Sequence, residues 1–352
     1  MTTHLSDVIV PEVFGNYVLN TALKTNRFVQ SGILTPDPDL GPRLLDAGTK
    51  ITVPFINDLS GDPDNWTDTD DIQVNQLTSG KQLGLKFYQT KAFGYTSLSQ
   101  MISGAPIQTT IGNRFANFWT RADEKMLLAV LNGVMGVSKV KNAKFYDATT
   151  KTPTDAAFSA KGFIAAIGLM GDLQDTTLGA IAVNSATYSM MKMQNLIETI
   201  QPANGALPFE AYNGLRIVLD DDIPVDLTDK QKPTTVSYIF APGAVRYSSI
   251  LASTETKYDP IKEGGTDIIV QKRVGTIHVA GTSVKSSFTP AKSTFPTMTE
   301  FSSSNTWEVV NGIDPRTIGV VAYKAELDPA LVPGAEVPTT GAAAAAKGGA
   351  GA

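Results

Sequence analysis

PIQTTIGNRFANFWTRADEKMLLAVLNGVMG, residues 106–136, is the stretch that decides the fold of this chain. Apolar side chains recur along it at helical spacing and charged side chains take the opposite side, which is typical of an amphipathic helix. Pro106 suits the first helical position, where its missing N–H breaks no hydrogen bond, and Gly133 and Gly136 are typical of a helix end. We therefore expect a helix of about six or seven turns. Its apolar face comprises Ile107, Ile111, Phe115, Phe118, Ala122, Met126, Ala129 and Val130, and its polar side comprises Arg114, Arg121, Asp123, Glu124 and Lys125.

Two stretches that precede this helix alternate between apolar and polar residues, as strands do. They are TKITVPFI at 49–56 and KQLGLKFYQTKAFGYTS at 81–97, and an acidic, polar segment with turn signals separates them. The pattern predicts a long two-stranded ribbon across residues 49–96. Such a ribbon is only marginally stable alone in water, so we expect a partner to order it, with Trp66 near its tip as an anchor.

The sequence outside the ribbon and the long helix predicts an N-terminal arm, an α/β lobe and further strands toward the C-terminus. Three prolines in SGILTPDPDLGP, residues 31–42, exclude a central strand, so the first 40 residues read as an arm. Residues 155–252 alternate helix and strand patterns, which predicts an α/β lobe. Two further strand runs, separated near Gly275, cover 266–288, and a last strand precedes a low-complexity tail from Pro329 that we expect to be disordered.

The composition favours a protein that assembles. Only 18% of the 352 residues are charged, against about 25% in average proteins, and surface hidden against neighbours needs fewer charges. The net charge of -5 argues against sequence-specific binding to nucleic acid. The basic clusters Lys139, Lys141, Lys144 and Lys272, Arg273 are expected to be solvated or to contact other subunits. The chain has no cysteine, and we find no signal peptide or membrane span, so we expect a cytosolic origin.

Candidate catalytic residues are few. Of the two histidines, His4 lies in the arm and His278 lies within a strand pattern, where a hydrogen-bonded structural histidine is expected. Asp220, Asp221 and Asp222 could hold a divalent cation, but the following Ile-Pro favours a turn with Asx-type hydrogen bonds. The acidic residues at the ribbon tip, Asp62, Asp64, Asp68, Asp70 and Asp71, are expected to be solvated. The sequence therefore predicts no catalytic, cofactor-binding or metal-binding residue, and the alternative of a metal-dependent cytosolic hydrolase rests on the Asp220 cluster.

Several stretches together resemble the major capsid proteins of tailed bacteriophages. They are LSDVIVPEVFGNYV with FVQSGI, residues 91–134 from KAFGYTS to LNGV, YNGLRIVLDDDIPV with YIFAPGA, QKRVGTIHVAG, and NTWEVV. Each is moderately specific, their joint order is specific, and they run from about residue 5 to about residue 325. The chain departs from the family pattern at Ala105, where an Asp is common, and at His278-Val279, where His-Pro is common.

The resemblance implies an α+β, HK97-type capsid fold with an N-arm, an extended E-loop β-ribbon, a P domain with a long spine helix and an α/β A domain. The implied parts are an N-terminal arm at 1–40, the E-loop at 41–98, the spine helix of the P domain at 99–154, the A domain at 155–255, P-domain strands at 256–300, a return strand at 301–328 and a disordered tail at 329–352.

The resemblance also implies a structural subunit without enzymatic activity. Such subunits assemble in the host cytoplasm, as pentamers and hexamers, into the icosahedral head of a virion that encloses double-stranded DNA. The implied partners are other copies of the chain, a portal protein, a separate scaffolding protein and a decoration protein, with no membrane and no cofactor. An encapsulin-like cellular compartment is the alternative. We expect contacts between subunits at Trp66, Asp62, Asp64, Asp68, Phe87, Tyr88, Arg114 and Arg121.

Overall fold

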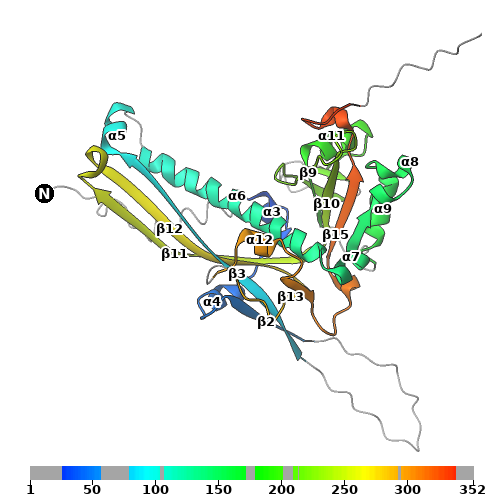
Figure 1. The fold of residues 1–352 in the computed structure, drawn as a ribbon, viewed down its shortest axis with the longest axis horizontal. Coiled ribbons are helices and arrows are strands. Elements are labelled where there is room, and N and C mark those ends of the chain that lie inside the picture. The colour runs from blue at the N-terminus through cyan, green and yellow to red at the C-terminus, as the bar shows by residue number, and fades with distance from the viewer. Residues whose placement is uncertain are drawn as a thin grey trace, which may run out of the picture.

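Two lobes share one long helix (Figure 1). The computed structural model describes residues 26–56, 79–103, 107–171, 179–200, 209–212, 214–291 and 295–337. One lobe is elongated and consists of a five-stranded sheet with helix α6, Ile107–Met135, packed along it. The other is an α/β lobe around a larger sheet. The C-terminal end of α6 reaches the α/β lobe, so this helix connects the two (Figure 1).

Helix α6 confirms the expected spine helix, although its end differs from the prediction. Gly133 lies inside the helix, which continues to Met135. A Cβ at Gly133 would stand 2.2 Å from the carbonyl oxygen of Phe301, so this glycine allows the short helix α12, Met298–Phe301, to approach. The glycine is thus required for close packing and not for helix termination.

The elongated sheet has the strand order β1-β11-β12-β3-β2. Strands β2, Lys50–Ile56, and β3, Ser79–Thr96, pair antiparallel, which confirms the base of the ribbon. Strand β1, Leu34–Pro36, lies at the edge, where proline is tolerated. The other two strands are β11, Val245–Asp259, and β12, Thr266–Val279.

The expected break near Gly275 is wrong, because β12 runs through it without interruption. The ring of Phe87 on the neighbouring strand lies over Gly275 and would come within 2.3 Å of a Cβ there. The aromatic ring fills the space that the missing side chain leaves, so the strand continues.

The larger sheet has the order β4-β15-β10-β5-β8-β7-β6, with β9 paired to β10. Helix α9, Ala160–Gly168, begins at the Ser159 cap, and α11, Ser185–Met193, begins at Asn184, whose side chain accepts from Thr187 N–H. The strands are β4 Phe145–Asp147, β5 Ala180–Val183, β6 Glu198–Ile200, β7 Phe209–Tyr212, β8 Leu215–Leu219, β9 Val225–Asp226, β10 Thr234–Phe240 and β15 Val320–Glu326.

Three of the expected boundaries need correction. Strand β11 already belongs to the elongated sheet at Val245, whereas we expected the A domain to extend to residue 255. Strands β4 and β15, expected in other parts, pair within the α/β lobe. The expected tail begins too early, since Pro329–Leu331 forms a turn and Val332 is buried on the α/β lobe. Residues 338–352 lie outside the described chain.

The shorter elements occupy the periphery and the connections. They are α3 Arg27–Gln30, α4 Leu40–Leu44, α5 Ser97–Ser103, α7 Ser138–Lys144, α8 Pro153–Ala156, β13 Thr282–Val284, β14 Trp307–Val309 and single 3-10 turns at Ala148–Thr150, Lys262–Gly264 and Pro315–Thr317. Within the described ranges, no helix has the length and apolar character that a membrane crossing requires.

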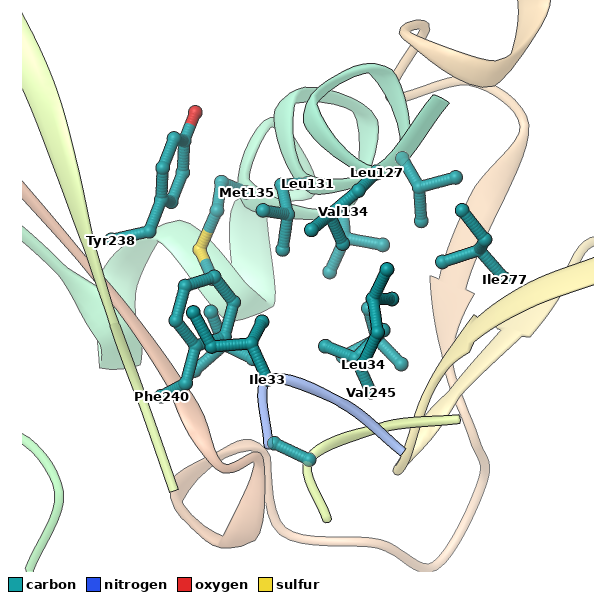
Figure 2. Packing of buried hydrophobic residues seen from close by; sticks show 14 of the residues in the cluster. Ile33, Leu34, Leu127, Leu131, Val134, Met135, Tyr238, Phe240, Val245 and Ile277 are labelled. Carbon is teal, nitrogen blue, oxygen red and sulfur yellow. The ribbon is translucent and has the colours of Figure 1, made fainter. Parts of the chain in front are cut away.

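A continuous apolar core joins the two lobes at the C-terminal half of α6 (Figure 2). Leu127, Leu131 and Val134 of this helix face Ile277 of the elongated sheet on one side and Tyr238 of the larger sheet on the other. The α/β lobe has a second core between its sheet and α9 and α11. The shared core therefore orients the elongated lobe relative to the α/β lobe.

Candidate functional site

The middle of α6 is attached to the elongated sheet by a buried ion pair. Arg273 of β12 lies 2.8 Å from the carboxylate of Asp123 on α6, and both side chains are almost fully buried. The hydroxyl of Tyr247, on β11, donates to the other carboxylate oxygen of Asp123 at 2.7 Å. A charge can be buried in this way because its partner and its hydrogen bonds replace water.

The guanidinium of Arg273 is held on its remaining sides by aromatic and amide groups. Its Nε and Nη2 donate to Gln89 Oε1 on β3. Its central carbon, Cζ, lies 4.3 Å from the ring centre of Trp119 and 5.4 Å from that of Phe87, a favourable cation-π arrangement. Trp119 in turn donates to Gln271 at 2.7 Å. We call Asp123, Arg273, Tyr247, Gln89, Gln271 and Trp119 the buried network.

The buried network corrects three sequence-based expectations. Asp123 was expected on the polar side of the helix, and Arg273 was expected at the surface, but both are buried. Lys272, the next residue, is exposed and pairs with Glu255 at 2.8 Å, as expected for a solvated lysine. Because consecutive strand residues point to opposite faces of the sheet, the sequence implies that Lys272 and Arg273 lie on different faces. No neighbouring residue indicates which of these faces α6 covers. Phe87 also lies inside the protomer and presents no surface to a neighbour.

Lys144 and His278 are also interior groups. Lys144 was expected at the surface but is buried, and its ammonium donates to the carbonyl of Leu169 at 3.0 Å. Burial lowers the pKa of Lys144 to about 8, with Asp314 opposing. The imidazole Nε2 of His278 lies 2.7 Å from Gln82 Oε1. Burial, and next Arg246, lowers the pKa of His278 to about 4, so it is neutral at pH 7 and structural, as expected.

The three consecutive aspartates form the expected turn after β8. Asp220 accepts from the backbone N–H of Asp222 at 2.9 Å, which is the Asx-type bond. Asp221 accepts from the N–H of Ser185 at the start of α11. Asp222 lies 3.9 Å from the ammonium of Lys125 on α6. Across the described ranges, no three acidic or histidine side chains are grouped in a way that could hold a metal ion.

An open groove of about 820 Å³ lies between this turn and the N-terminal half of α6. Arg114 and Arg121 lie on its α6 side, and both are exposed. Neither makes an ion pair with any residue of the described ranges. The rings of Phe93 and Phe118 line the same groove and contact each other edge to face, with the ammonium of Lys91 over both rings. The other lining residues are Arg27, Asn117, Thr120, Glu124, Asp220, Asp221 and Asp222.

Apart from the buried Phe87, the expected contact residues between subunits fall into three groups. Trp66, Asp62, Asp64 and Asp68 lie outside the described residues, as does His4. Tyr88 is half-buried, with its ring 3.9 Å from that of Phe295 and its hydroxyl donating to Gly48. Arg114 and Arg121 are placed together in the groove.

Sequence reasoning missed an apolar surface at the end of the elongated lobe that lies far from the α/β lobe (Figure 1). Met101 and Ile102 of α5 are 81% and 77% exposed, and Ile261 in the turn between β11 and β12 is 91% exposed. Ser97 N–H donates to Gly265, which brings α5 beside this turn. Clustered exposed apolar side chains indicate a contact surface. We call Leu98, Met101, Ile102, Tyr258 and Ile261 the end patch.

The two-lobed architecture is similar in fold to a solved phage capsid structure. The capsid of Ralstonia phage GP4 is similar, with a TM-score of 0.52, 10% identity, and coverage of 72% of this chain and 84% of that chain. The capsid of cyanophage Pam1 has a TM-score of 0.49, 9% identity, and coverage of 84% and 88%. The fold is the α+β, HK97-type fold of phage capsid subunits.

Sequence comparison gives the family. The major capsid protein of Bacillus phage SPP1 is 31% identical over 327 residues, which are 92% of this chain and 98% of that protein. The chain belongs to the phage major capsid proteins, which form the virion shell from many copies in a structural role. No family model matches the chain.

Proposed function

We propose that the chain assembles as pentamers and hexamers into an icosahedral head that encloses phage double-stranded DNA. The identity of 31% to a phage major capsid protein, across nearly the whole of both chains, carries this proposal. We include a portal protein, a separate scaffolding protein and a decoration protein as partners. The net charge of -5 favours enclosure of the DNA without sequence-specific contacts.

A purely structural role, with no catalysis, is part of the same proposal. The Asp220 cluster was the basis for the alternative of a metal-dependent hydrolase, and its carboxylates accept backbone hydrogen bonds within a turn. The encapsulin-like alternative is not favoured, because the relative and the solved structures are phage capsids.

We further propose that the ribbon tip of one copy contacts the groove of a neighbour. Residues 57–78 contain six aspartates and no lysine or arginine. The groove presents Arg114 and Arg121 without partners in the described chain, beside the aromatic rings of Phe93 and Phe118. Pairing of these aspartates with Arg114 and Arg121, on the α6 side of a lining whose turn side is acidic, would set the register of such a contact. Trp66 would supply an apolar anchor. The end patch supplies a second surface for contact between copies.

A charge exchange tests the ribbon contact. Arg114→Glu with Arg121→Glu should leave the circular dichroism of the protein unchanged but abolish closed shells in electron micrographs and in sucrose gradients. Adding Asp64→Lys and Asp68→Lys to the same chain should restore shells at least in part, since the attraction returns with reversed sign. Lys151→Glu, a charge reversal at an exposed lysine outside the groove and outside the basic clusters, is the control and should assemble normally. Normal assembly of the double arginine variant would refute the contact.

A further inference from the structure

The groove beside α6 has one acidic side chain more than it has basic ones. Its lining contains three arginines, Arg27, Arg114 and Arg121, and four acidic residues, which are Glu124 and the three turn aspartates. With Glu124 ionised the lining has a net charge of -1, and with Glu124 protonated the charges balance. We infer that protonation of Glu124 removes this excess negative charge and thereby makes the contact between α6 and the 220–222 turn dependent on pH.

Asp220 is the group that makes a second negative charge unfavourable here. Its side chain is 9% exposed. One carboxylate oxygen accepts from Asp222 N–H at 2.9 Å, whereas the other is buried and has no hydrogen-bond partner in the described chain. A buried carboxylate that lacks part of its hydrogen bonding is poorly stabilised. A neighbouring carboxyl group therefore tends to keep its proton.

The surroundings of Glu124 act in the same direction. Burial, and next the charge of Asp220, raises the pKa of Glu124 from 4.5 to about 7, while Arg27 opposes and Asp222 and Asp123 add to the rise. Burial also raises the pKa of Asp220.

Some of the other charged groups near Glu124 have partners of their own. The guanidinium of Arg27 donates to the carbonyl of Leu219 at 3.0 Å, and Asp123 is paired with Arg273. Lys125 lies 3.9 Å from Asp222, and Lys91 lies over the rings of Phe93 and Phe118. Arg114, Arg121 and Asp221 line the groove as well. The charges that act on the Glu124 carboxyl are those of Asp220, Arg27, Asp222 and Asp123.

The sign of the pH dependence follows from this arrangement. The folded chain holds the Glu124 proton more tightly than the unfolded chain, whose glutamate pKa is 4.5. Stability is therefore fully present below about pH 4.5 and is lost as the pH rises to about 7. Above pH 7 the extra charge repels the turn from α6, which loosens the junction between the lobes.

Thermal unfolding against pH tests the inference on the full chain, with its assembly state held constant by concentration and checked by sedimentation. Between pH 4.5 and 8 the Tm of Glu124→Gln should rise relative to the unmodified chain by about 3 °C or more, and the two should converge at pH 4.5. Glu308→Gln, at an exposed glutamate on β14, is the control and should follow the unmodified chain. Hydrogen exchange of residues 121–125 and 219–223 should become faster above pH 7 in the unmodified chain but not in Glu124→Gln.

A second variant identifies the cause. Asp220→Asn keeps an oxygen that can accept from Asp222 N–H but removes the facing charge, so the pH midpoint should move toward acid. Equal pH dependence of Tm in Glu124→Gln and in the unmodified chain would overturn the inference. An unmoved midpoint in Asp220→Asn would do the same, even if Glu124→Gln failed to fold.

Discussion

The two lobes hold their helices by different physical means. In the α/β lobe, all four residues of β5 are buried and α9 packs on the sheet through Phe163, Ala166 and Ile167. In the elongated lobe, the middle of α6 is attached to the sheet through the buried network, with a small apolar cluster around Phe115 and Trp119 beside it. Apolar packing is non-directional, whereas an ion pair with fixed hydrogen bonds accepts one geometry.

The difference corresponds to the shapes of the lobes. The α/β lobe encloses its core between a sheet and two helices, so apolar area alone stabilises it. The elongated lobe is a narrow sheet with a single long helix along it (Figure 1). Among the described residues, the buried apolar cluster at the middle of this helix consists of Phe115, Ala116, Trp119 and Ile269. A buried charge pair there can set the position of α6 along the strands, as buried polar groups set register elsewhere. We expect this lobe to be the one whose geometry depends on individual polar residues.

Removing one member of the ion pair should have the largest effect. Arg273→Met leaves Asp123 buried without its counter-charge, which should lower the free energy of unfolding by about 3–5 kcal/mol. Urea unfolding followed by tryptophan fluorescence measures this loss, since Trp119 contacts the guanidinium. Asp123→Asn in the same chain should recover part of the loss. Lys272→Met, at the exposed neighbour, should change stability by less than about 0.5 kcal/mol. A similar loss of unfolding free energy in Arg273→Met and in Lys272→Met would contradict the view that the buried ion pair holds α6 on the sheet.

Truncation in the core of the α/β lobe should cost about as much or slightly less. Ile181 on β5 is fully buried, and Ile181→Ala should lower the free energy of unfolding by about 2–5 kcal/mol through lost burial and the remaining cavity. In the buried network, Asp123→Asn should recover part of the stability lost in Arg273→Met. We expect no comparable second substitution to recover the stability lost in Ile181→Ala. Ile164→Ala on α9 is the matched control, because Ile164 is 61% exposed. A large loss for Ile164→Ala would show that this face is covered.

The smallest effect on the protomer is expected at the end patch. Met101→Ser with Ile102→Ser removes exposed apolar groups, so the free energy of unfolding should change by less than about 0.5 kcal/mol. Shell yield in sucrose gradients should nevertheless fall, because the surface that a neighbour would cover is lost. Val337→Ser, at another exposed apolar residue, should assemble normally. Full shell yield in the double variant would remove the end patch from the proposed contacts.

Much of the fold was predictable because it depends on local periodicity. The helical spacing between 106 and 136 identified α6, and alternation identified β2 and β3. The Asx turn at Asp220 followed from side-chain chemistry within a few residues. Arg114 and Arg121 were predictable as exposed helix residues, but not as the lining of one groove with the aspartate turn, because about 100 residues separate these positions in the chain.

The sequence by itself determined the order and type of the main elements, the absence of cysteine chemistry and the family. Only the tertiary structure decided which charged residues are buried. Asp123 and Lys144 were expected at the surface because a charged residue on a helix is usually solvated, and the helix sequence alone does not show that another element covers it. Both are buried. The same holds for Arg273 in its strand, and for Gly133, which is explained by Phe301 far along the chain. The physical reason is that burial depends on packing between residues far apart in the chain. Periodicity reports only the local secondary structure and its apolar face.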